Sequence, residues 1–67
     1  MRDWLKEERL KQRLTQKQMA DALRITESYY SFIESGDRQK KMDVSLAMNI
    51  GNILGLSIEE IIAKEEM

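Results

Sequence analysis

Residues 14–36 read L-T-Q-K-Q-M-A-D-A-L-R-I-T-E-S-Y-Y-S-F-I-E-S-G, and this stretch decides the fold. It contains two short segments, each preceded by a threonine that can cap a helix, Thr15 or Thr26. Apolar residues recur at helical spacing in both segments, and only Arg24 and Ile25 stand between them. Two helices joined by so short a turn must cross steeply.

A steep crossing of this kind is the helix-turn-helix arrangement, in which the second helix can lie in the major groove of DNA. Helical periodicity divides that second helix into two faces. Tyr30 and Ile33 point inward toward Met19 and Leu23 of the first helix. The outward face consists of Glu27, Ser28, Ser31 and Phe32, with Tyr29 at the border.

Phe32 has three interpretations, because a solvent-facing phenylalanine is unusual on a small domain. It can contact the methyl group of a thymine in DNA, or it can pack on a partner protein. In the third interpretation the face assignment is wrong by one residue and Phe32 belongs to the core. The sequence leaves all three open.

The flanking sequence predicts three further helices. The first of these helices spans residues 3–13. At the end of the quoted stretch, Gly36 suits the left-handed conformation that often ends a helix. Asp43 can cap the next helix, in which Gly51 permits close packing. Ser57 can cap a last helix that runs to about residue 64, and we expect residues 65–67 to fray. We therefore predict a compact, all-α, five-helix fold that forms a single domain over residues 1–67.

Composition excludes several classes of function. The chain has no Cys and no His, which rules out disulfides and the common zinc sites, so we expect no metal and no cofactor. Nothing pairs a nucleophile with a base, and no concave site for a small-molecule ligand is evident, so we do not expect an enzyme. No apolar run approaches the roughly 20 residues that span a bilayer, and the N-terminus is not a secretory signal. We expect a cytoplasmic protein without membrane contact.

The net charge of −1 argues mildly against nucleic acid, but the charges are unevenly placed. Residues 57–67 carry four acids and one base, a net of −3, so residues 1–56 carry 10 bases and 8 acids, a net of +2. Gln16 and Lys17 occupy a first helical turn, where free N–H groups favour an anion. The basic residues Arg38, Lys40 and Lys41 follow the second helix of the pair, where they can grip a DNA backbone.

Together these residues resemble the XRE family, the lambda-type repressor and Cro helix-turn-helix regulators, over roughly residues 4–62. The resemblance implies a five-helix lambda-repressor-like domain that binds double-stranded DNA and regulates transcription in a sequence-specific, repressor-like manner. The matching pieces are Arg9 with Leu14-Thr15-Gln16, Met19-Ala20 with Leu23, Ile25 to Ser31, Ile33 to Gly36 with Arg38, and Leu54 to Ser57 with Glu59-Glu60-Ile61.

The resemblance also implies roles for individual residues. Arg9 and Glu34 would form an ion pair between helices. The side chains expected to face bases are Glu27, Ser28, Ser31 and Phe32, and those expected to face phosphates are Gln16, Lys17, Tyr29, Arg38, Lys40 and Lys41.

The chain departs from the family pattern in ways that keep other functions open. Arg24 and Arg13 stand where glycine is frequent, and the predicted recognition helix has no Lys or Arg. One alternative is a protein-interaction module that keeps the fold with weak or no DNA binding. Another is an antitoxin-type partner, or the DNA-binding half of a toxin–antitoxin or phage lysis–lysogeny switch.

We further expect a homodimer on a two-fold-related site. The candidate dimer contacts are Leu56, Ile58 and Ile62 in and beside the last helix. The alternative is that the last helix only closes the core of the monomer.

Overall fold

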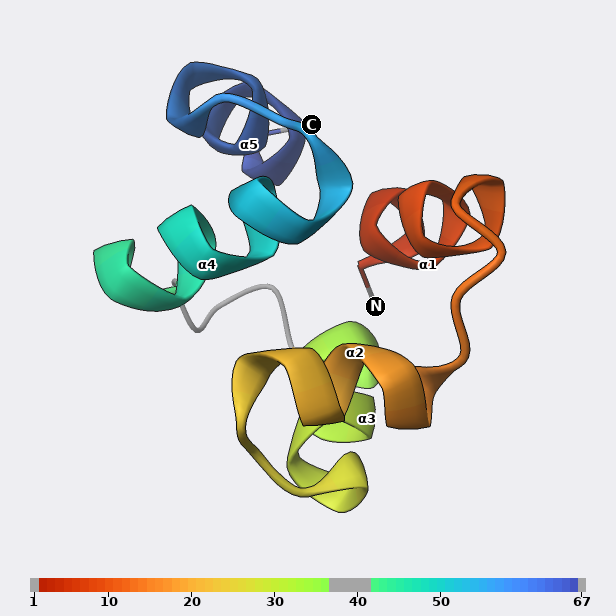
Figure 1. Ribbon diagram of the computed structural model, residues 1–67. Helices are drawn as coiled ribbons and strands as arrows, with labels where there is room; N and C mark the ends of the chain where they lie inside the picture. The colour runs from red at the N-terminus through yellow and green to blue at the C-terminus, as the bar shows by residue number, and fades with distance from the viewer. Residues whose placement is uncertain (1, 37–41, 67) are drawn as a thin grey trace.

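The computed structural model describes residues 2–36 and 42–66 and confirms the five-helix, all-α fold (Figure 1). The helices are α1 (Asp3–Lys11), α2 (Gln16–Leu23), α3 (Glu27–Ser35), α4 (Val44–Leu54) and α5 (Ile58–Glu65). The crossed pair α2 and α3 forms one end of the molecule, while α5 lies at the other end (Figure 1).

Helices α2 to α5 each begin at a capping side chain, as the sequence predicts. The Thr15 hydroxyl accepts a hydrogen bond from the backbone N–H of Gln18 at 3.0 Å. The Gln18 side-chain oxygen accepts in return from the backbone N–H of Thr15 at 2.8 Å, which completes a capping box. A second capping box opens α5 at Ser57, and Thr26 and Asp43 cap α3 and α4.

Two turns place a residue with a side chain in the left-handed region of backbone space. Arg13 has φ 58° and Arg24 has φ 59°. The left-handed residue at the α2–α3 turn reverses the chain, so that the N–H of Ile25 donates to the carbonyl of Ala20 at 3.0 Å. This conformation costs a residue with a Cβ about 1 kcal/mol or more. At the turn between α1 and α2, Arg13 adopts this conformation, and α1 ends at Lys11, two residues before the predicted end.

All five helices contribute to one hydrophobic core. Tyr30 from α3, Leu5 from α1 and Ile50 from α4 are fully buried at its centre. Truncating a buried side chain of this size to alanine costs about 2–5 kcal/mol. Within residues 2–36 and 42–66, the buried apolar residues of the core are Trp4, Leu5, Met19, Ala20, Tyr30, Ile33, Ala47, Ile50, Leu54 and Ile61.

The prediction of a left-handed cap at Gly36 is wrong. Gly36 has φ −65° and ψ 165°, an extended conformation that any residue adopts. A Cβ at this position would lie 2.6 Å from the carbonyl oxygen of Phe32. Glycine is therefore required here by the close approach of the backbone at the end of α3.

The two ends of the chain meet, which contradicts the expected fraying at Glu65. The Nε of Arg2 donates to both carboxylate oxygens of Glu65 at 3.0 Å, and the indole Nε1 of Trp4 donates to one of them at 2.9 Å. Arg2 also donates through Nη1 to the carbonyl of Ile33 at 2.6 Å, and through its backbone N–H to that of Glu34 at 2.7 Å. The C-terminal helix is thus tied to the C-terminal end of α3.

In residues 2–36 and 42–66, no single helix is long and apolar enough to cross a membrane. The pair α4 and α5 passes a test of length and composition together, but the two helices are bent by 110° at their junction. Buried core helices pass the same test, and α4 directs Ala47, Ile50 and Leu54 into the core.

Gly51 provides a test of the packing between α4 and the chain that leads into α5. A Cβ there would lie 2.6 Å from the carbonyl oxygen of Leu56 and 3.0 Å from Cδ1 of Ile61. We expect Gly51→Ala to lower the free energy of unfolding by about 1–2 kcal/mol, because overpacking against backbone outweighs the gain in helix propensity. Urea denaturation followed by circular dichroism measures this change. The control Lys6→Ala, on the exposed side of α1, should leave stability unchanged or slightly raised, and an equal loss in both variants would contradict the packing argument.

Candidate nucleic-acid interface

The exposed face of α3 agrees with the predicted outward face. Glu27 and Ser28 are exposed, and Tyr29 and Phe32 are 50% and 53% exposed. Ser31 is half-buried. The exposure of Phe32 rules out the interpretation that assigned it to the core.

The polar part of this face adjoins the beginning of α2. An open hollow is lined by Gln16 from α2 together with Glu27, Ser28 and Ser31 from α3. The fold therefore brings together one residue expected at a phosphate and three expected at bases. Because the hollow is shallow and open, it suits a polar edge of a large ligand better than an enclosed small molecule.

The aromatic side chains on the exposed face of α3 line a different hollow. Tyr29 and Phe32 line a second hollow whose other walls include Met42 and Leu46, at the start of α4. Arg2 and Asp43 also line this second hollow, so Phe32 lies beside both apolar and charged side chains. The structure does not bring Phe32 to the hollow that Gln16 lines. The exposed surface of α3 has a polar half and an aromatic half.

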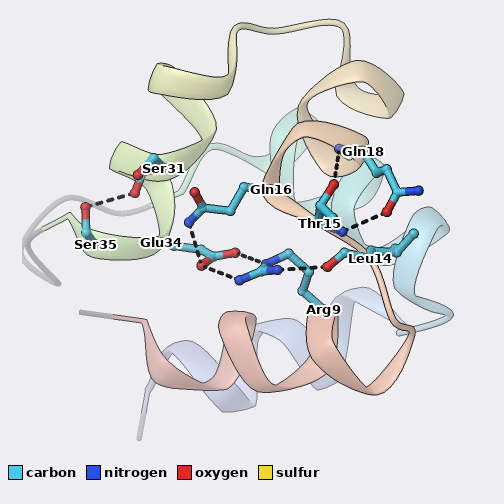
Figure 2. Close-up of polar contacts among 8 residues, drawn as sticks. All are labelled: Arg9, Leu14, Thr15, Gln16, Gln18, Ser31, Glu34 and Ser35. Carbon is cyan, nitrogen blue, oxygen red and sulfur yellow. Dashed lines mark hydrogen bonds and ion pairs between the residues drawn. The ribbon is translucent and has the colours of Figure 1, made fainter.

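A buried carboxylate joins α1, α2 and α3 beneath this surface (Figure 2). The predicted ion pair is present: Arg9 Nε donates to Glu34 Oε2 at 2.6 Å, and Glu34 is only 2% exposed. Arg9 Nη1 also donates to the carbonyl of Leu14 at 2.8 Å, in the chain that leads into α2. The side-chain amide of Gln16 donates to Glu34 Oε1 at 3.3 Å. Glu34 therefore sets the position of the first turn of α2 relative to α3.

The hydrogen bonds to Glu34 determine its charge. Burial opposes its ionisation, but hydrogen bonds, with that from Arg9 the largest, outweigh burial and lower the pKa of this carboxyl. Burial, and then the neighbouring Glu34, raises the pKa of the Tyr30 phenol far above its usual value. Arg9 supplies the largest stabilisation of the carboxylate, and the neighbouring Tyr30 hydroxyl and the Gln16 amide add to it, although the Tyr30 hydroxyl does not meet full hydrogen-bond geometry in the described residues.

The candidate phosphate contacts are divided between described and undescribed parts of the chain. Gln16 and Lys17 form the first turn of α2, whose first N–H groups have no acceptor within the helix. Lys17 is exposed, and Gln16 is half-buried against Glu34. The other basic residues expected at phosphates, Arg38, Lys40 and Lys41, lie outside the described residues.

Arg2 is a residue that sequence reasoning missed. Its guanidinium is buried and holds the C-terminal end of α3, the helix that carries the exposed polar face. No local pattern in the sequence indicates this role, because its partners Ile33 and Glu65 are 31 and 63 residues away. The sequence offers one signal for this contact: the basic Arg2 precedes the first helix, and the acidic Glu65 ends the last one.

The three candidate dimer contacts do not form one exposed patch. Leu56 and Ile58 are half-buried and pack against the core of the monomer, whereas Ile62 is 51% exposed.

In the described residues, no group of three or more His, Cys, Asp or Glu side chains is arranged to hold a metal ion.

Comparison with known proteins agrees with the crossed pair of helices. The sequence model of the helix-turn-helix family matches residues 5–61, which is most of the chain. The chain belongs to the helix-turn-helix family.

The helix-turn-helix chain is also similar to a protein of Bacillus subtilis (strain 168) named "Uncharacterized HTH-type transcriptional regulator YqaF". The two sequences are 44% identical over 55 residues, which cover 82% of this chain and 70% of that protein. No solved structure matches the chain. Within this helix-turn-helix protein, α2 and α3 are the two helices of the motif, and α3 occupies the place of the recognition helix.

The lowered pKa of Glu34 predicts how stability depends on pH. Since its folded pKa lies below the unfolded value near 4.5, its contribution is present above pH 4.5 and is lost as pH falls through the folded value. We expect Glu34→Gln to lower the free energy of unfolding at pH 7 by about 3 kcal/mol, because the Arg9 charge loses its buried partner. The difference from wild type should shrink as the pH falls below 4.5 and through the folded pKa.

Urea denaturation at several pH values, followed by far-UV circular dichroism, measures this dependence. Glu66→Gln is the matched control, since Glu66 is exposed at the end of α5 and should leave the pH dependence of wild type intact. A constant difference between Glu34→Gln and wild type across the whole pH range would show that Glu34 is not held ionised by its partners.

Proposed function

We propose that this helix-turn-helix protein is a sequence-specific DNA-binding regulator of transcription that acts as a repressor, with α3 in the major groove. One observation supports this most directly: Glu34 holds Gln16 beside the exposed polar residues of α3, so a single surface carries both kinds of DNA contact. Membership of the helix-turn-helix family and the similarity to a protein named as a transcriptional regulator support the same function.

In this proposal the contacts divide by chemistry. The carboxylate of Glu27 accepts from the amino group of a cytosine, and the hydroxyls of Ser28 and Ser31 contact base edges. Phe32, on the aromatic half, contacts a thymine methyl at the margin of the site. The contacts to phosphates come from Gln16, Lys17, Tyr29, Arg38, Lys40 and Lys41.

The regulator acts in the cytoplasm as a homodimer on a two-fold-related site. Two copies double the number of base contacts that one short recognition helix supplies, and they set the spacing of the half-sites. Such a dimer needs no cofactor and no enzymatic step, so the amount of protein and its partners control its occupancy of DNA.

DNA binding is tested by selecting sequences from a random duplex library and measuring affinity by fluorescence anisotropy. We expect Lys17→Ala to weaken binding to all sequences alike and to reduce the slope of log affinity against log salt by about 1. We expect Ser28→Ala to lose about 5-fold or more in discrimination at one base position. Lys64→Ala, which removes the same charge from α5 at the other end of the molecule, should change neither quantity.

Two results would overturn the proposed function. One is the absence of any enriched sequence at about 50 mM salt, where phosphate contacts are strong. The other is an affinity that Lys64→Ala reduces as much as Lys17→Ala does, because binding would then follow total charge and not this surface.

The aromatic half of α3 favours a second candidate, a protein-interaction module. Tyr29 and Phe32 are half exposed beside Met42 and Leu46, and α3 presents Glu27 without any Lys or Arg. In this alternative the fold is kept, DNA binding is weak or absent, and the partner is a protein such as a cognate toxin. Phe32→Ala would then disrupt a protein complex and leave any affinity for DNA unchanged.

A further inference from the structure

The exposed side of α4 carries no charge, although 34% of the residues in the chain are charged. α4 contains no Asp, Glu, Lys or Arg, whereas each of the other four helices exposes at least one charged side chain, such as Lys6, Lys17, Glu27 or Glu59. The exposed residues of α4 are Val44, Ser45, Met48, Asn49 and Asn52.

These residues form one continuous surface, which we call the α4 face. Val44, Met48 and Asn52 follow one another at intervals of four, and Ser45 and Asn49 run beside them, so all five lie on one side of the helix. The opposite side carries the residues that α4 contributes to the core. Val44 and Met48 are 67% and 54% exposed, so the N-terminal half of the strip is apolar. The exposed N-cap Asp43 lies directly before this strip and is the charged group that borders it.

Two features of the α4 face, its lack of charge and its exposed Met48, are typical of a protein interface. The centres of protein interfaces are depleted in charge and enriched in residues such as Met, whereas surfaces that bind DNA carry cations for the phosphates. The α4 face has no cation to offer to a phosphate. We therefore expect the α4 face to bind a protein surface that is also uncharged.

We propose that the α4 face is the homodimer interface, in which α4 of one copy packs against α4 of a second copy across a two-fold axis in solution. This rests on the proposed function, which requires two copies on one operator. In a two-fold contact each residue meets its own copy or a close neighbour of it, so a charged face repels itself and an uncharged face does not. Asn and Ser also suit self-pairing, because each side chain both donates and accepts hydrogen bonds.

Charge favours the α4 face over α5, where the sequence placed the dimer contact. On α5 the exposed Ile62 is accompanied by exposed Glu59 and Glu66, and a second copy would oppose acids with acids. The other two candidates, Leu56 and Ile58, are partly used in the monomer core. Only Ile62 of the original set remains as free apolar surface.

The absence of cysteine allows a clean cross-linking test. Single cysteines are introduced at Ser45, Met48 or Asn52, and, as matched controls of similar exposure on α5, at Glu59 or Ile62. A disulfide needs Cα atoms within about 7 Å, so residues near the two-fold axis cross-link and distant ones do not. We expect a disulfide-linked dimer from at least one α4 position under mild oxidation, and monomers from both α5 positions.

Sedimentation equilibrium of the cysteine-free protein measures how strongly this surface drives dimerisation. We expect wild type to dimerise with a Kd in the micromolar range, and Met48→Glu to raise that Kd about 10-fold or more. Ile62→Glu, a matched change on α5, should leave it within about 2-fold. Thermal unfolding of both variants at a concentration where wild type is monomeric confirms that they remain folded.

The proposal is overturned by a wild type that remains monomeric at about 100 µM. It is equally overturned if cross-links form only on α5, or if Ile62→Glu breaks the dimer and Met48→Glu does not. Binding to a DNA with a single half-site, measured on Met48→Glu, separates this inference from the proposed function. If Met48→Glu loses the dimer but still binds the half-site, the result supports both the α4 interface and the proposed function. If the cross-linking and sedimentation results contradict the α4 interface but the protein still binds the half-site, only the proposed function is supported.

Discussion

The buried carboxylate of Glu34 is the interaction on which the arrangement of α1, α2 and α3 depends. It accepts hydrogen bonds from Arg9 of α1 and Gln16 of α2 while it belongs to α3, so one group relates three helices. Burying both charges of such a pair costs much of what their attraction returns, so the pair adds little to net stability. Its directional hydrogen bonds instead determine how the start of α2 lies relative to α3.

A second connection fixes the other end of the recognition helix. Arg2 caps the last carbonyls of α3 and pairs with Glu65, so α3 is held near its C-terminal end by both the first and the last helix of the chain. Helix ends leave carbonyl groups unsatisfied, and a buried guanidinium with several donors in a fixed plane satisfies them well. A short, nine-residue helix thereby acquires a defined orientation without a large core around it.

The exposed surface is divided into regions of different chemistry. The polar half of α3 adjoins Gln16, the aromatic half adjoins the start of α4, and the α4 face is free of charge. Helix α5 lies at the opposite end of the molecule from the α2–α3 pair (Figure 1), and its Glu65 is paired with Arg2. The overall charge of −1 therefore says little about binding, because an ion or a base responds to the nearest groups and is screened from the rest.

Local signals in the sequence determined most of the secondary structure. Thr15, Thr26, Asp43 and Ser57 predicted where helices begin, since a capping side chain acts within three residues of itself. Periodicity placed Tyr30 inward and Phe32 outward, and the family resemblance supplied the Arg9–Glu34 pair. What only the tertiary structure decided depends on contacts between distant residues: the bond from Gln16 to Glu34, the Arg2–Glu65 connection, the close approach that requires glycine at position 36, and the separation of Phe32 from the polar hollow. These contacts have no local signature, because each arises only after the helices have packed, and packing is set by the whole core.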